Sequence, residues 1–265
     1  SMTSKIPVFL FAVLFIHQAH ATLLVYDDFS GYTTDTSVVG QGPAATGFTG
    51  NWTSTGGGLA GTVDFYPRAS GLSHTALAGS GGSLEHFRSS GDANSKQITR
   101  SISFTPETVS GSDVLYLGML FRYSGSSDVD ATVTYFGDTR DNEFRLNNGN
   151  FNIQLAGGNG SNLNLGAVSA DTTHMVLLRV SDNTTGGGGN DLYYDNVEAW
   201  LNPADLNSLG SANASGVGII SKFLGGNTDI SADGLSMAGL LEAGESFSMD
   251  EFFVTTDIAA IPEPG

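Results

Sequence analysis

The strongest constraint on the fold is the spacing of apolar residues, which from Thr22 onward recur at every second position or in short continuous runs. Clusters of Gly, Asn, Asp and Ser end each run. Such alternation is typical of half-buried β-strands, and short apolar runs between turn residues are typical of strands buried on both faces. Ten strands joined by short links predict an all-β fold, an antiparallel sandwich of two sheets. The ten predicted strands are 23–29, 99–104, 114–124, 131–137, 142–147, 151–156, 173–182, 192–202, 216–221 and 246–254.

Glycine-rich turns support the same fold class. The chain has 36 glycines in 265 residues, about twice the usual share. Asn148-Gly149 lies between two alternating runs and predicts a tight hairpin, because both residues tolerate a positive φ. Segments 202–209 and, weakly, 232–241 are the helical candidates. No repeat or linker divides the chain, so we expect one domain at 22–256.

The charge balance excludes some partners. Ten Lys and Arg against 27 Asp and Glu give a net charge of −17, which repels nucleic acid and anionic lipid. The same acidity suits calcium, neutral glycans or simple solubility. The absence of cysteine excludes disulfides, thiolate metal sites and a cysteine nucleophile.

The first 21 residues have the pattern of an export signal. One lysine precedes an apolar run over 6–16, and small residues at Ala19 and Ala21 form an A-x-A cleavage site. We expect a signal helix at 1–21, cleavage after Ala21, and Ser1 as a residue left by cloning. A buried N-terminal helix is the alternative. The mature protein is therefore predicted to be secreted or held at the cell surface.

Five segments, in order, resemble one known family. They are LLVYDDFSGY at 23–32, ASGLSHTALAGSGGSL at 69–84, VLYLGMLFRYSG at 114–125, VLLRVSD at 176–182 and FSMDEFFV at 247–254. Together they look like the concanavalin-A-like, laminin-G-like jelly roll of many secreted planctomycete and verrucomicrobial proteins. The resemblance implies two curved antiparallel sheets with the first and last strands adjacent. It does not decide function, because lectins, glycosidases and adhesion modules share this fold.

Catalysis has little support in the sequence. Glycosidases need two carboxylates flanking the scissile bond, and glycosidases of this fold carry them as Glu-x-Asp-x-x-Glu, which this chain lacks. The histidines lie in no hydrolase or zinc-protease motif. We therefore predict no catalytic residue and treat enzyme activity as the less favoured reading. The closest acidic pairs are Asp27/Asp28, Asp141/Glu143 and Asp250/Glu251, and the histidines of the mature chain are His74, His86 and His174.

The sequence suggests two kinds of ligand, a calcium ion and a sugar. The resemblance implies a structural calcium ion held between an acidic residue after the first strand, Asp27 or Asp28, and Asp250 in the last strand; calcium prefers such oxygen ligands. Aromatic rings can stack on sugar, so Trp52, Tyr193 and Trp200 are candidate ligand-binding residues. Burial in the core is the alternative for both tryptophans.

The C-terminal segment 257–265 resembles a sorting signal. Pro262, Glu263 and Pro264 follow a small-residue linker, as in the PEP-CTERM signal of Gram-negative bacteria that make exopolysaccharide. In that family an apolar helix and a basic cluster follow, and an exosortase-type enzyme removes them; neither is present here. Either the sequence was cut at the motif, or the likeness is accidental. We expect a disordered tail and only a transient membrane contact during export.

Three functions are consistent with these observations. The favoured one is a non-enzymatic protein of the bacterial extracellular matrix or cell surface that binds polysaccharide, adheres or self-associates. The second is a polysaccharide-degrading enzyme on the same fold. The third is a structural subunit of an extracellular filament or coat, assembled through edge strands.

Overall fold

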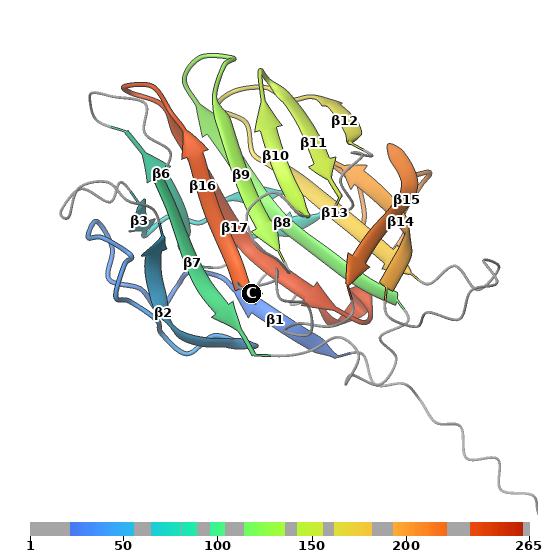
Figure 1. Cartoon of the computed structure of the whole chain (residues 1–265), viewed down its shortest axis with the longest axis horizontal. Coiled ribbons are helices and arrows are strands. Elements are labelled where there is room, and N and C mark those ends of the chain that lie inside the picture. Colours follow the sequence, from blue (N-terminus) through green and yellow to red (C-terminus); the bar gives the residue numbers. More distant parts are fainter. Residues whose placement is uncertain are drawn as a thin grey trace, which may run out of the picture.

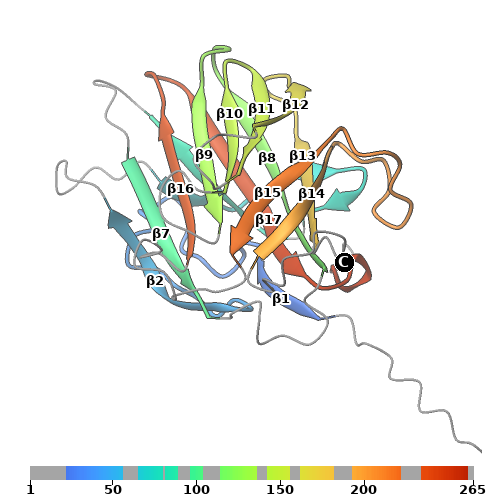
Figure 2. The ribbon, with the colours of Figure 1, turned by 45° about the vertical axis from the view of Figure 1, so that its right-hand side comes forward.

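The computed structural model describes residues 22–55, 65–79, 81–88, 96–103, 114–135, 142–155, 162–181, 193–221 and 234–261. Within these ranges the chain forms β-strands and one short 3-10 turn, η2 (Ile258–Ala260). The predicted all-β fold is confirmed, because two antiparallel sheets stack as a jelly-roll sandwich (Figures 1 and 2). The described part holds no helix with the length and apolar character needed to span a bilayer.

The first sheet, sheet A, has eight strands and contains both ends of the domain. Its order is β15-β14-β13-β8-β17-β6-β3, and β1 pairs with β17. The first and last strands are therefore adjacent, as the resemblance implied. The strands are β1 (Leu23–Asp27), β3 (Phe65–Arg68), β6 (Ser83–Phe87), β8 (Val114–Ser124), β13 (His174–Ser181), β14 (Tyr193–Leu201), β15 (Ala214–Ser221) and β17 (Ser246–Thr255).

The second sheet, sheet B, has seven strands in the order β12-β11-β10-β9-β16-β7-β2. The predicted hairpin at Asn148-Gly149 joins β10 to β11, with φ values of 49° and 67°. A separate small hairpin is formed by β4 (Ser73–His74) and β5 (Leu77–Ala78). The strands of sheet B are β2 (Phe48–Thr55), β7 (Lys96–Ile102), β9 (Asp130–Tyr135), β10 (Glu143–Asn147), β11 (Asn150–Gln154), β12 (Leu163–Ala167) and β16 (Gly234–Leu240).

Two apolar clusters result from this arrangement. The larger lies between the sheets and includes Phe144, Phe151 and Met237. The smaller, which we call the outer cluster, lies on the other face of sheet A and includes Leu120, Leu177, Trp200, Phe253 and Ile261. Central strands of sheet A are therefore buried on both faces, which explains the unbroken apolar runs of β8 and β13.

The structure corrects the weaker helix prediction. Segment 232–241 contains β16, which pairs with β7 and β9. Leu235 and Met237 point into the core between the sheets. Ser236 lies on the opposite face, where its hydroxyl forms a hydrogen bond with that of Thr99. The period of this segment is therefore two, and its glycines disfavour a helix. Residues 202–209 form turns and not a helix.

Candidate functional site

The outer face of sheet B carries a row of polar side chains that we call the polar stripe. Cross-strand register places its members side by side on β7, β16, β9, β10, β11 and β12, and each is partly or fully exposed. Their sequence neighbours point into the core, as alternation in a strand requires. Its polar members are Gln97, Thr132, Arg145, Asn152 and Asn164, and the small apolar Ala238 of β16 lies between Gln97 and Thr132.

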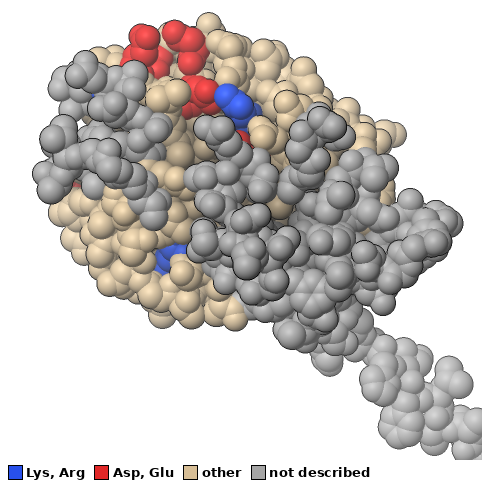
Figure 3. Space-filling model, viewed as in Figure 1, with Lys and Arg blue, Asp and Glu red and all other residues tan. Residues whose placement is uncertain are grey.

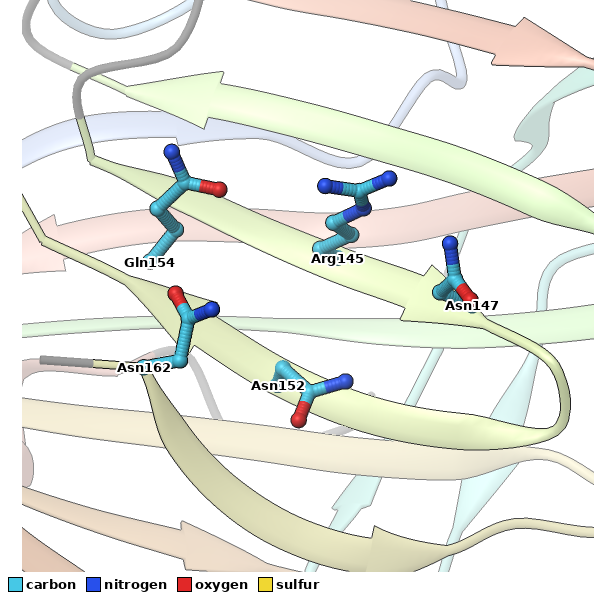
Figure 4. A pocket seen from close by; sticks show the side chains of 5 residues that line it. All are labelled: Arg145, Asn147, Asn152, Gln154 and Asn162. Carbon is cyan, nitrogen blue, oxygen red and sulfur yellow. The ribbon is translucent and has the colours of Figure 1, made fainter. Parts of the chain in front are cut away.

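A pocket of about 240 Å³ opens on this stripe, and we call it the amide pocket. Two side chains come from β10, two from β11 and one from the residue before β12, and Figure 4 shows all five around the same space. Four of the five are carboxamides, which both donate and accept hydrogen bonds. This chemistry matches hydroxyl groups, which do the same. The lining residues are Arg145, Asn147, Asn152, Gln154 and Asn162.

Asp130, at the start of β9, holds two of these side chains. Its Oδ2 accepts hydrogen bonds from Nη2 of Arg145 at 3.0 Å and from Nδ2 of Asn147 at 3.2 Å. The Nε of Arg145 is buried and has no acceptor. A buried donor without an acceptor is unfavourable for the folded state.

The predicted aromatic platform is not what the structure shows. Trp52 is fully buried, and its Nε1 donates to the hydroxyl of Tyr32 at 3.0 Å. Trp200 is buried in the outer cluster and donates to the carbonyl of Gly210 at 2.9 Å. Neither ring offers a face to a sugar, and the core alternative is correct for both. Tyr193 lies on β14, but its side chain is outside the described part.

Asp27 is held in a buried ion pair. Its buried carboxylate pairs with Nη1 of Arg100 at 3.0 Å and accepts hydrogen bonds from the Tyr32 hydroxyl at 2.6 Å and the Phe29 amide at 2.9 Å. Burial raises its pKa, while the Tyr32, Phe29 and Arg100 contacts lower it. Because the guanidinium of Arg100 already neutralises this carboxylate, Asp28 is the better candidate of the two acids that were predicted as alternative calcium ligands beside Asp250.

Asp250 lies fully buried at a bulge in β17. Its carboxylate accepts hydrogen bonds from the amides of Leu72 and Glu251, each at 2.7 Å. Burial is the main cause that raises its pKa to about 8, and the charges of Glu251 and Asp28 add to this shift. Phe29, which follows Asp28, and Glu251, which follows Asp250, have φ values of 54° and 50°. Such strain in large residues is held only by well-determined surroundings.

The Asp28 and Asp250 carboxyls fit a calcium ion better than a transition metal. The loop between β5 and β6 passes close to both: a Cβ added at Gly79 would lie 2.6 Å from Oδ2 of Asp250, and one at Gly81 would lie 3.0 Å from Cγ of Asp28. Over the described ranges no group of three His, Cys, Asp or Glu side chains is arranged to hold a metal. Calcium accepts backbone carbonyl oxygens beside carboxylates, and these two acids would be its charged ligands.

The described acids and histidines form no recognisable catalytic arrangement. His86 stacks on Phe65 with ring centroids 4.1 Å apart. The Nδ1 of His174 contacts the Asn202 side chain at 3.0 Å. Both rings are buried, which indicates structural roles. Asp141 lies outside the described residues.

Sequence reasoning missed the amide pocket. Four of its five members lie in NEFRLNNGNFNIQ at 142–154, where polar residues alternate with apolar ones, and the fifth is Asn162. That alternation predicted two strands and a turn, and it also fixed which residues face outward. A row of outward amides on paired strands was the available signal.

Comparison with known proteins identifies no family. No family model matches the sequence, and no curated protein does. Solved structures match at low identity. A carbohydrate esterase from the Shiga toxin-encoding bacteriophage phi24B is 13% identical with a TM-score of 0.48, over 89% of this chain and 98% of that one. The botulinum neurotoxin serotype C1 binding domain is 8% identical with a TM-score of 0.49, over 88% and 48%.

The type G receptor binding domain of botulinum neurotoxin is 10% identical with a TM-score of 0.44, over 84% of this chain and 47% of that one. This chain therefore spans about half the length of the toxin domains. Likeness at this level concerns the fold alone, so function must be argued from the chain's own residues.

Proposed function

We propose that this domain is a non-catalytic glycan-binding module whose binding face is the outer face of sheet B. The amide pocket is the observation that carries the proposal, because four carboxamides and one guanidinium line a space on an exposed polar surface. Strands lie about 4.8 Å apart, so the polar stripe offers a regular series of contacts on both sides of the pocket. An extended polysaccharide lying across the strands would meet several of them.

Hydrogen bonds, rather than stacking, would supply the affinity, since none of the described residues that line the pocket is aromatic. Each neutral hydrogen bond contributes about 0.5–1.5 kcal/mol net. Five such contacts give roughly 3–7 kcal/mol, which corresponds to dissociation constants from several millimolar to about 10 μM. Binding to a polymer would exceed binding to a short oligosaccharide, because the polymer presents many equivalent sites.

The test is affinity electrophoresis and pull-down with a panel of soluble and insoluble polysaccharides. We expect retention on at least one neutral polysaccharide, reduced about tenfold by Asn152→Ala, which removes one set of pocket contacts and changes ΔG by about 1.4 kcal/mol. Asn207→Ala is the matched control, since Asn207 is an exposed amide outside the pocket. Equal retention of the Asn152→Ala and Asn207→Ala variants would show that the amide pocket is not the binding site. Release of reducing ends from the polysaccharide would favour the alternative function, a polysaccharide-degrading enzyme.

We also propose that Asp28 and Asp250 bind a structural calcium ion. A cation would offset the charge of the buried Asp250 and its acidic neighbours, and ligand binding to the folded state alone raises stability. Calorimetry should show heat on adding calcium, and a chelator should lower the melting temperature. Asp28→Asn should remove both effects, whereas absence of both in the unmodified protein would contradict the site.

Export is the remaining part of the proposal. The pattern at 1–21 supports passage out of the cytoplasm, and the motif at 262–264 supports processing by an exosortase-type enzyme; both segments lie outside the described residues. Mass spectrometry of the exported protein should give Thr22 as the first residue. A cell-associated chain that keeps residues 1–21 would argue against this route.

A further inference from the structure

Charge around the amide pocket is balanced by a single carboxylate. Among the described residues that line the pocket, Arg145 alone is charged. Asp130 pairs with it while also holding Asn147 through the same oxygen. The side chains of Arg145 and Asp130 are 37% and 24% exposed. The pair is thus close enough to solvent to meet a ligand, and Asp130 cancels the positive charge that Arg145 would otherwise present.

The surroundings do not restore a positive potential. Glu143, two residues before Arg145 in β10, is a buried acid and supplies no positive charge, and the whole chain carries a net charge of −17. Figure 3, which views the molecule as in Figure 1, shows mostly uncharged surface on the described residues, with a few acidic and basic side chains close together near the upper edge. An anionic saccharide would therefore meet like charge at the pocket.

We infer that the pocket binds neutral, hydroxyl-bearing saccharides more tightly than carboxylated ones, and that Asp130 sets this selectivity. This inference rests on the proposed glycan-binding function. A hydroxyl oxygen can accept from an N–H of Arg145 that Asp130 leaves unused. A carboxylate on the ligand would compete with Asp130 for the guanidinium of Arg145, and the negative charge of Asp130 would repel it. Asp130 is a positioning residue, because it acts on the ligand through Arg145 and Asn147.

The test compares a neutral β-glucan with polygalacturonate by affinity electrophoresis at low and high salt. The unmodified protein should bind the neutral polymer more tightly by at least about tenfold, equivalent to 1.4 kcal/mol. Asp130→Asn keeps the size of the side chain and removes its charge. It should raise affinity for polygalacturonate about tenfold, and added salt should reverse that gain, because exposed charges are screened.

Two further variants separate a charge effect from a structural one. Asp171→Asn is the matched control, because Asp171 also pairs with an arginine, Arg122, in an exposed ion pair; it should leave the preference unchanged. Adding Arg145→Gln to Asp130→Asn should abolish the gain. Circular dichroism melts establish that each variant folds.

Three outcomes would overturn the inference. Equal binding of both polymers by the unmodified protein would do so, as would an unchanged preference in Asp130→Asn; either leaves the glycan-binding function intact. If a folded protein binds none of the neutral or anionic polysaccharides, the glycan-binding proposal fails and the selectivity fails with it.

Discussion

The two outer faces of the sandwich differ in what covers them. On sheet A the outer cluster joins Leu120, Leu177 and Phe253 to residues of the β4–β5 hairpin, the 202–213 turns and the end of the chain, including Ile261. On sheet B the polar stripe is partly or fully exposed along its length. One face thus contributes burial and stability, and the other leaves its polar groups accessible to solvent.

The largest expected effect comes from the covered face. Trp200→Ala removes a large buried side chain from the outer cluster, so unfolding free energy should fall by about 3–5 kcal/mol. Glycan affinity should stay within about twofold, since ΔΔG values at distant sites without shared partners are independent. Urea unfolding and affinity electrophoresis on the same preparation measure both. A loss of glycan binding in the folded Trp200→Ala variant would show that the outer cluster of sheet A and the polar stripe of sheet B are not independent.

The next effect is the pH dependence caused by Asp250. Its pKa is about 8 in the folded protein against an ordinary value of 3.8. Below about pH 4 the group is protonated in both states and imposes no penalty. Between about pH 4 and pH 8 the unfolded state holds fewer protons, so stability falls as pH rises, by at most about 1.4 kcal/mol per pH unit.

Urea unfolding at about pH 5 and pH 8 in the presence of a chelator measures this dependence. Asp250→Asn should lose stability less steeply than the unmodified protein over the same window. Parallel pH profiles would show that Asp250 does not titrate there. Calcium should flatten the profile of the unmodified protein, because a bound cation favours the ionised carboxylate.

The smallest expected effect lies at Leu240, which follows Ala238 on the outward side of β16 and is 45% exposed. Leu240→Ser should change unfolding free energy by less than about 0.5 kcal/mol, as for other exposed positions. Thermal unfolding checks this. A loss above about 2 kcal/mol would mean that this part of sheet B is covered in the same way as sheet A.

The sequence was sufficient for most strands, because their alternation or apolar continuity follows directly from burial on one face or two. It missed β2, β3, β6, β12 and the two-residue strands β4 and β5, and it predicted a helix where β16 lies. FTGNWTST at 48–55 holds Gly and Asn, FYPR at 65–68 holds Pro, and β6 and β12 are only five residues long, so local propensity is weak and pairing decides.

The site was harder to predict because it depends on register. Nothing near Asp27 in the sequence shows that Arg100 is its partner. The sequence therefore predicted Asp27 as a possible calcium ligand, whereas the structure places it in a buried ion pair. Likewise, Asp130 and Arg145 lie on neighbouring strands, and only the pairing of β9 with β10 brings them together. Alternation fixes the face of a residue but not its neighbour across the sheet.

A heteronuclear NMR titration with a neutral oligosaccharide that the full domain retains tests whether glycan binds to the outer face of sheet B. Outward residues of β9, β10 and β11, with Arg145 and Asn152 foremost, should show the largest shift changes, and the 202–213 segment should show none. Largest changes around Trp200 or on the covered face of sheet A would contradict the account.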